Sequence, residues 1–223
     1  TRLATYLYFK VINRKKKMKI LELLANYGFF SKPIENQGGS IFRIDQTLYP
    51  NLDLAQDFNY LDKSQIHFEP DLIWARIPGT HFSVASMGKH WDRENNNPLT
   101  EDATRSIELV KNVTRLIAEI NPTYWGIECT RGKLRKLDLI DKKYLKTISL
   151  CTYGDERMKP TDIWCNFYHI WEPRTMCKNG DPCHISAPRG SRAGSQGDVN
   201  EKYKFNLPEE LPLEIYNVLK GKL

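Results

Sequence analysis

The sequence predicts an α/β fold of three layers, built on a doubly wound and mostly parallel sheet. Strand-like and helix-like segments alternate through the first 130 residues, which is typical of sheets covered by helices on both faces. The apolar run LIWA (72–75) leads directly into RIPGT (76–80), as a buried strand does when it ends in a loop at the sheet edge. Ligand sites of such folds lie at that edge.

Three short apolar runs predict the first strands. They are MKILELL (18–24), SIFRID (40–45) and DLIWARI (71–77), and we expect the first of them to be central in the sheet. The segment between the first two contains Pro33, so we expect only a short helix or a loop there.

The clearest helix covers 100–120. Thr100 can cap it, acidic residues follow in the first turn, and Asn121-Pro122 ends it. Apolar residues recur at helical spacing at Ile107, Val110, Val113, Ile117 and Ile120. The remaining predicted elements are strands at 123–129, 146–153 and 161–167 and a closing helix at 208–219.

Composition sets broad limits on the protein class. The 223 residues suit one large domain, and a hydrophobic content of 40% is enough for a packed core. A formal net charge of +6 favours an anionic partner such as nucleic acid. No run of 18 apolar residues occurs, so no transmembrane helix is predicted, and we expect a monomer.

Two segments are set apart from the main domain, which we place at 18–223. Residues 1–17 put an apolar stretch before a basic run, the reverse of a secretory leader, and we interpret them as a disordered or extraneous extension. The segment 172–199 is rich in Gly, Pro and Ser and is a candidate recognition loop or small subdomain.

The five cysteines, an odd number, predict reduced thiols and a cytoplasmic setting. Cys177, Cys183 and His184, with His169 nearby, invite a zinc interpretation. Their spacing matches no standard zinc finger, and adjacent Cys and His ligands are sterically awkward. We therefore predict no metal.

Three stretches carry a family pattern: RIPGTHFSVASMGKHW (76–91), YGDERMKPTDIW (153–164) and APRGSRAGSQG (187–197). With these stretches in the family's order, the sequence resembles the DNA (cytosine-5) methyltransferases, in particular a short phage-type branch. The resemblance covers about residue 18 to the last residue. It implies the Rossmann-like fold of S-adenosylmethionine-dependent methyltransferases, S-adenosylmethionine as cofactor, and double-stranded DNA as partner. It also implies the cytoplasm of a bacterium or phage-infected cell.

The resemblance assigns catalytic positions. In that family a cysteine in an S-P-P-C-T loop attacks carbon 6 of a flipped cytosine, which lets carbon 5 accept the methyl group. The matching position here is Gly79, which has no side chain to attack with. Glu128 matches the glutamate that assists the ring nitrogen, and Arg157 is the nearest match to a supporting arginine. Cys129 is an alternative nucleophile, because the related RNA enzymes use this second loop, although an inert buried cysteine is the simpler interpretation.

The loop after the first strand is small and glycine-rich in the family, so that backbone can approach the cofactor. Here Tyr27 and Phe29 occupy it, and we therefore predict weak or absent cofactor binding. Asp45 would hold the ribose and Asp57 would face the adenine. The implied cofactor-contacting residues are Leu24, Ala25, Asn26, Asp45 and Asp57.

The basic segment 131–136 and the glycine-rich stretch are expected at a DNA-facing rim. The implied DNA contacts are Thr80, Ser83, Arg131, Lys133, Arg189 and Arg192. Two hypotheses follow: an impaired methyltransferase that retains DNA binding, or an active enzyme with a relocated nucleophile. The losses concentrate at the catalytic and cofactor loops, which favours the first.

Overall fold

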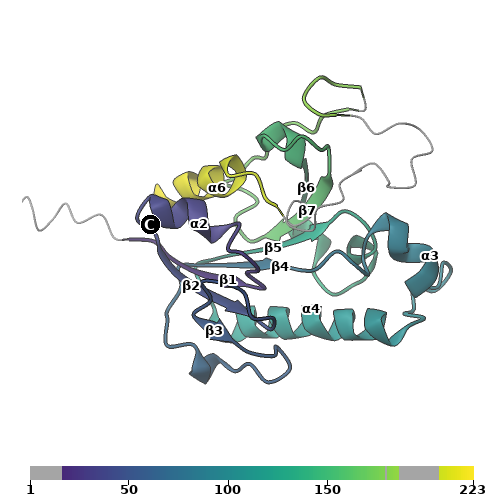
Figure 1. The fold of residues 1–223 in the computed structure, drawn as a ribbon, viewed down its shortest axis with the longest axis horizontal. Helices are drawn as coiled ribbons and strands as arrows, with labels where there is room; N and C mark the ends of the chain where they lie inside the picture. Colours follow the sequence, from purple (N-terminus) through teal and green to yellow (C-terminus); the bar gives the residue numbers. More distant parts are fainter. Residues whose placement is uncertain (1–16, 179, 186–205) are drawn as a thin grey trace, which may run out of the picture.

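The computed structural model describes residues 17–178, 180–185 and 206–223, which form a single sheet covered by helices on both faces (Figure 1). The expected N-terminal extension, but for Lys17, and most of the candidate recognition loop, including Arg189 and Arg192, lie outside the described residues.

The sheet has seven strands in the order β3-β2-β1-β4-β5-β7-β6. Strands β1 to β5 are parallel, whereas β7 runs antiparallel to both of its neighbours. The strand order reverses between β1 and β4, and a crevice at the carboxyl ends is expected at such a switch point. The strands are β1 (Lys19–Leu23), β2 (Ser40–Asp45), β3 (Leu54–Ala55), β4 (Leu72–Arg76), β5 (Tyr124–Thr130), β6 (Leu145–Ser149) and β7 (Pro160–Cys165).

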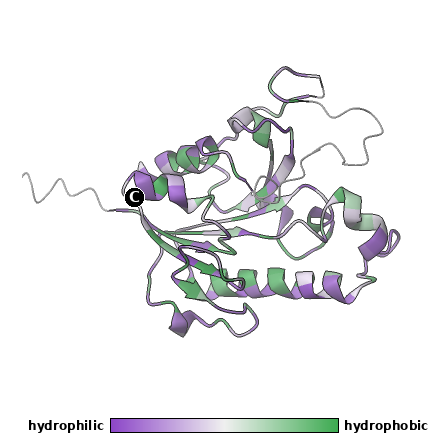
Figure 2. Cartoon of the chain, viewed as in Figure 1, coloured by the Kyte–Doolittle hydropathy of each residue, from purple (hydrophilic) through white to green (hydrophobic). Residues whose placement is uncertain are grey.

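Helices cover the sheet unequally. The long helix α4 (Glu101–Ile120) lies along one face, while α2 (Ser31–Asn36) and α6 (Glu210–Lys220) lie on the other (Figure 1). Thr100 caps α4 by accepting the amide of Ala103, as predicted. The apolar stripe of α4 faces the sheet, and its polar side faces outward (Figure 2). A short helix, α3 (Met87–His90), follows the loop after β4.

Two apolar cores result, one on each face of the sheet. The first contains Val110 and Val113 of α4, and the second contains Leu211 and Ile215 of α6. In the described residues, no helix is long and apolar enough to cross a membrane.

The predicted strand at 146–153 is too long. Strand β6 ends at Ser149, and a 3₁₀ turn (Leu150–Tyr153) follows, closed by Gly154 at φ 98°. The reason is tertiary, because Leu150, Cys151 and Tyr153 are all buried by this turn.

Candidate functional site

A cleft of about 460 Å³ opens at the carboxyl edge of the sheet, and we call it the edge cleft. Its walls come from the loops after β1, β2 and β4, from the end of β5 and from the segment before β7. Eight residues predicted from the sequence line it: Leu24, Asn26, Asp45, Gly79, Thr80, Ser83, Glu128 and Arg157. The structure therefore brings together residues as far apart in the sequence as Leu24 and Arg157.

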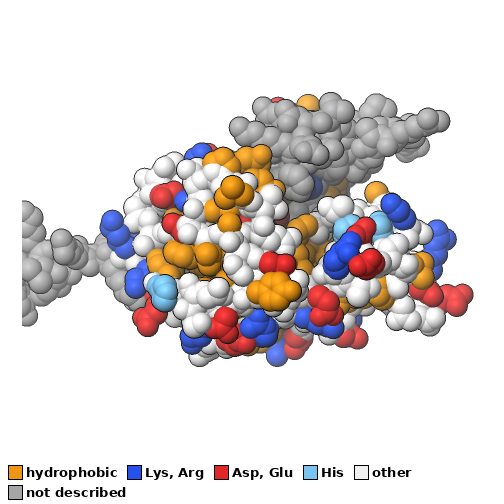
Figure 3. All heavy atoms as spheres, turned by 60° about the horizontal axis from the view of Figure 1, so that its bottom comes forward, with side chains coloured by type: hydrophobic (Ala, Val, Ile, Leu, Met, Phe, Trp, Pro, Cys, Tyr) orange, Lys and Arg blue, Asp and Glu red, His pale blue; other side chains and the backbone are white. Residues whose placement is uncertain are grey.

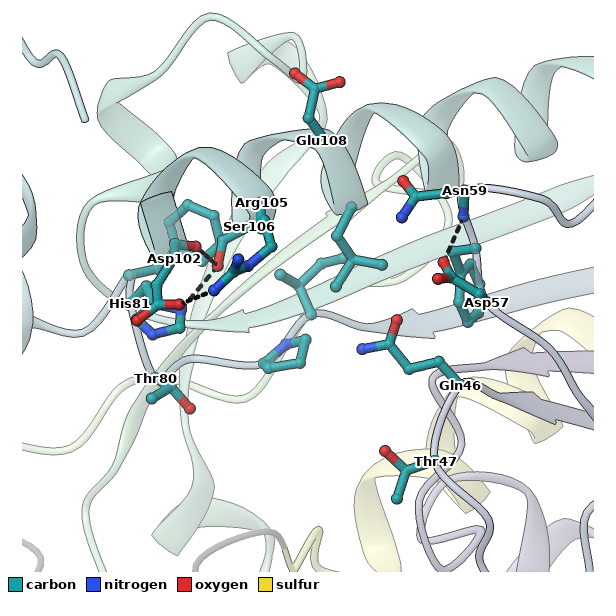
Figure 4. Close-up of a pocket in the computed structure, with 15 residues that line it drawn as sticks. Gln46, Thr47, Asp57, Asn59, Thr80, His81, Asp102, Arg105, Ser106 and Glu108 are labelled. Carbon is teal, nitrogen blue, oxygen red and sulfur yellow. Dashed lines mark hydrogen bonds and ion pairs between the residues drawn. The ribbon is translucent and has the colours of Figure 1, made fainter. Parts of the chain in front are cut away.

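A second cavity of about 660 Å³, the outer cavity, adjoins the edge cleft and shares its wall at 77–78 and Thr80. Asp57 lies here, with Arg105 and Ser106 of α4 on the opposite side (Figure 4). His81 reaches Ser106 Oγ through Nδ1 at 2.8 Å. Burial lowers the pKa of His81, with a further contribution from nearby His90.

The loop after β1 keeps an unusual backbone shape. Leu24 and Asn26 adopt left-handed conformations, at φ 56° and 52°, which cost little for glycine but are strained for leucine. Neither Tyr27 nor Phe29 lines the edge cleft. Tyr27 is 39% exposed and lies against Tyr49, with ring centroids 5.1 Å apart. These aromatic side chains therefore do not line the cleft, although Arg76, which does line it, lies 5.7 Å from the centroid of the Phe29 ring. Ala25, predicted to contact the cofactor, is fully buried.

Two buried carboxylates hold this loop. Asp45 accepts the amide of Asn26 at 2.9 Å and that of Thr47 at 2.9 Å. Glu22, inside β1, accepts the amides of Phe30 and Ser31 at 3.2 Å each. Burial raises the pKa of both carboxyl groups. Glu22 was missed by sequence reasoning, although an acidic residue inside an apolar strand is a readable signal.

Glu128 is held by a cation that sequence reasoning did not assign. Strands β4 and β5 place Arg76 beside Glu128, and Arg76 Nε donates to Glu128 Oε2 at 2.8 Å. The two residues are only 8% and 5% exposed, so this ion pair is shielded from water. Arg157, which also lines the cleft, forms an ion pair with Asp155 at 2.8 Å.

Lys159 adds a second unassigned cation to the edge cleft. It lies at φ 26°, a strained conformation for lysine, just before β7. Burial and the positive charge of Arg76 lower its pKa to about 8, although Glu128 partly offsets this. Strain combined with a shifted pKa is typical of functional sites.

The nucleophile position is tightly enclosed. A Cβ added to Gly79 would overlap the Cγ2 methyl of Thr130. Cys129 points to the other face of β5 from Glu128, is 1% exposed and belongs to the α4-side core. Burial raises the pKa of its thiol, with a further contribution from Glu128. These facts weigh against Cys129 as a relocated nucleophile.

The basic segment 131–136 divides into two kinds of residue. Lys133 is 3% exposed, and its Nζ donates to Asn96 Oδ1 at 2.7 Å. Arg135 Nε donates to Asp162 Oδ2 at 2.8 Å. Both residues therefore stabilise the fold through contacts within the chain, and the prediction that Lys133 contacts DNA is not supported. Arg131 and Lys136 are exposed.

Comparisons with known proteins gave matches in structure only. No family model matches the sequence, and no curated protein matches it. An E. coli prophage protein assigned as a DNA modification methyltransferase aligns over 77% of this chain, with 12% identity and a TM-score of 0.49. This chain covers 57% of that protein. Magnesium protoporphyrin IX methyltransferase from Synechocystis PCC 6803, solved with bound S-adenosylmethionine, aligns over 73% of this chain and 75% of its own, with 10% identity and a TM-score of 0.34.

The sheet topology defines the fold class of the protein. A sheet ordered 3-2-1-4-5-7-6, in which β7 is the antiparallel member of the described strands, is the Rossmann-like fold of S-adenosylmethionine-dependent methyltransferases. The fold class predicted from the sequence is confirmed. The edge cleft also has the size of a small-molecule site, which is typically about 300–1,000 Å³.

Proposed function

We propose that this protein is a DNA (cytosine-5) methyltransferase-like protein that binds duplex DNA but does not transfer methyl groups. One observation carries the proposal: the edge cleft assembles Glu128 and Arg157 around a loop whose nucleophile position is Gly79. In this proposal the supporting groups of a cytosine site are retained, while the reacting thiol is missing.

The missing thiolate accounts for the loss of activity. Addition of a nucleophile at carbon 6 is what makes carbon 5 of cytosine able to accept a methyl group. The side chains of Thr80 and Ser83, in the same loop, are neutral hydroxyls, which are weak nucleophiles without an adjacent base. Attack by Cys129 would require that residue to leave the core.

We further propose that the edge cleft and the outer cavity together hold S-adenosylmethionine, which when bound would supply the methyl group. In this proposal Asp45, which lines the edge cleft, binds the ribose, and Asp57, which lines the outer cavity, faces the adenine. The open cleft supports this assignment. The prediction that Tyr27 and Phe29 weaken this binding is tested by the calorimetry described below.

DNA is proposed as the partner because basic side chains lie on and near the cleft. Lys159 lines it, and exposed Arg131 directly follows β5. The formal net charge of +6 is consistent with a polyanion.

Two measurements on the full chain test the proposal. Calorimetry with S-adenosylhomocysteine should detect binding that Asp57→Asn weakens, and a tritium-methyl assay on mixed duplex DNA should detect no incorporation. Incorporation that Cys129→Ser abolishes would overturn the proposal in favour of a relocated nucleophile. Absence of DNA binding at low salt would refute the DNA-binding role, whatever the calorimetry shows.

A further inference from the structure

Three sulfur ligands and one imidazole converge at the end of β6, away from the edge cleft. Cys151, Cys177, Cys183 and His184 place their ligand atoms within 4.8 Å of one another, and we call them the sulfur cluster. Cys151 comes from the 3₁₀ turn after β6, and the other three come from the segment that follows β7. None of the four lines the edge cleft or the outer cavity.

From these positions we infer that the sulfur cluster is a structural zinc site. A tetrahedral Zn²⁺ with Zn–S of about 2.3 Å and Zn–N of about 2.0 Å separates two sulfurs by about 3.8 Å and a sulfur from a nitrogen by about 3.5 Å. Cys183 Sγ lies 3.6 Å from Cys151 Sγ. His184 Nδ1 lies 3.5 Å from Cys183 Sγ and 3.7 Å from Cys177 Sγ.

The Cys151–Cys177 pair departs from these spacings. Its sulfurs are 3.0 Å apart, closer than in a zinc site but far longer than the roughly 2.05 Å of a disulfide. All five cysteines of the chain are free thiols in the structure. Metal binding would displace the three thiol protons to solvent and widen this pair.

Local backbone geometry explains how adjacent residues reach one centre. The amide of Lys178 donates to Asp181 Oδ2 at 2.6 Å, and the amide of Asp181 donates back to Lys178 O at 3.1 Å. Gly180 supplies the left-handed conformation, φ 95°, for this tight turn. The turn brings Cys183 and His184 back to Cys177, so the objection to adjacent ligands does not hold, and the prediction of no metal is revised. The fourth ligand is Cys151 and not His169, which the sequence analysis considered.

The cluster has the burial expected of a structural site with an entry path. Cys151 and Cys177 are buried, His184 is partly buried and Cys183 is exposed. Four protein ligands would complete a tetrahedral shell, which is the closed arrangement of structural rather than catalytic zinc. The ion would fasten 177–184 to the end of β6. The amide of Ile185 donates to Glu156 O at 2.9 Å, so the same clamp supports the loop that carries Arg157.

Metal content of the full chain tests this inference. Protein expressed with added Zn²⁺ and purified with a non-thiol reductant and no chelator should contain one zinc per chain by mass spectrometry. Exchange into Co²⁺ should give the intense visible bands of a tetrahedral thiolate site. The cobalt spectrum of the unmodified chain does not depend on any variant folding.

Variants locate the ion. Cys183→Ser and His184→Gln should lose most of the bound metal, whereas the matched controls Cys165→Ser and His169→Gln should retain it. Wild-type protein with well below one equivalent of zinc would overturn the inference. So would equal metal content in all four variants, or a Cys151–Cys177 disulfide that persists under reductant.

Discussion

The shifted pKa of Lys159 makes stability depend on pH. Between its folded pKa of about 8 and its ordinary value of 10.5, the unfolded chain binds a proton that the folded chain has released. Stability from this group therefore rises with pH across that window, and below pH 8 the folded state carries the full cost of the buried charge. We expect Lys159→Met to melt at a higher temperature than wild type at pH 7, with the advantage shrinking towards pH 10. Thermal unfolding across this pH range measures it, and a Lys159→Met variant that melts lower at pH 7 contradicts it.

The contact between Gly79 and Thr130 determines what a restored nucleophile would do. Gly79→Cys should destabilise the fold by about 1–3 kcal/mol, the usual cost of overpacking, because its Cβ overlaps the Thr130 methyl. Adding Thr130→Ser removes that methyl and should recover most of the loss in urea unfolding. We expect methyl transfer from the double variant and not from Gly79→Cys alone, whose thiol is displaced. Transfer by the single variant at the level of the double variant would count against this geometry.

Among the elements, the segment after β5 separates folding residues from binding residues. Lys133→Ala should lower stability by about 1–3 kcal/mol, because it leaves Asn96 without its hydrogen bond and removes packing over the Trp91 ring. Arg131→Ala and Lys136→Ala should leave the melting temperature unchanged and weaken DNA binding. Melting curves and fluorescence anisotropy with labelled duplex, run on all three variants, distinguish these roles. A stable Lys133→Ala protein with reduced DNA affinity would restore the original assignment of Lys133.

Strands were predictable where burial follows from local sequence. β2 was predicted at its observed bounds, and β1, β4 and β5 to within one residue at each end, because continuous apolar runs indicate strands buried on both faces. Sequence pattern did not reveal the role of Lys133, since a long side chain can bury its stem and carry its charge to a distant acceptor. The pairing of Arg76 with Glu128 depends on the register of two strands 52 residues apart, which no local pattern encodes.

In the candidate site, too, local pattern could be read from the sequence and long-range packing could not. The location of the site followed from the motif residues, and eight of the predicted residues line one cleft. The position of the Tyr27 ring, against Tyr49, could not be predicted. It depends on the backbone of a loop in which the neighbouring residues Asn26 and Gly28 are left-handed. The zinc ligand Cys151 lies 26 residues before Cys177, and only the packing of the 3₁₀ turn brings them together.

For the whole molecule, the distribution of charge predicts where DNA does not bind. Basic and acidic side chains are interspersed on the face shown in Figure 3. On α4 they form ion pairs such as Lys111 with Glu108 and Arg115 with Glu119. The DNA-binding surface should therefore lie at the edge cleft and not along α4.

Salt titration tests this distribution. The logarithm of DNA affinity should fall linearly with the logarithm of salt concentration, with a slope of about 0.9 for each phosphate neutralised. Arg131→Ala should reduce the slope by about one such increment. Lys111→Ala, an exposed cation on α4, is the matched control and should leave both slope and affinity unchanged. Equal losses for the two variants would contradict a DNA-binding surface that is confined to the edge cleft.

The second apolar core has a consequence for how the chain folds during synthesis. It joins Met18 and Ile20, at the start of the described chain, to Ile215 and Leu219 of α6, near its end. Strand β1 leaves the ribosome well before α6, so one of its faces has no complete cover until α6 has been translated. At about 5–20 residues per second, that face stays open for at least ten seconds. The nascent chain therefore offers chaperones an apolar surface while the residues between β1 and α6 are made, and this half of the molecule completes its folding after α6 emerges.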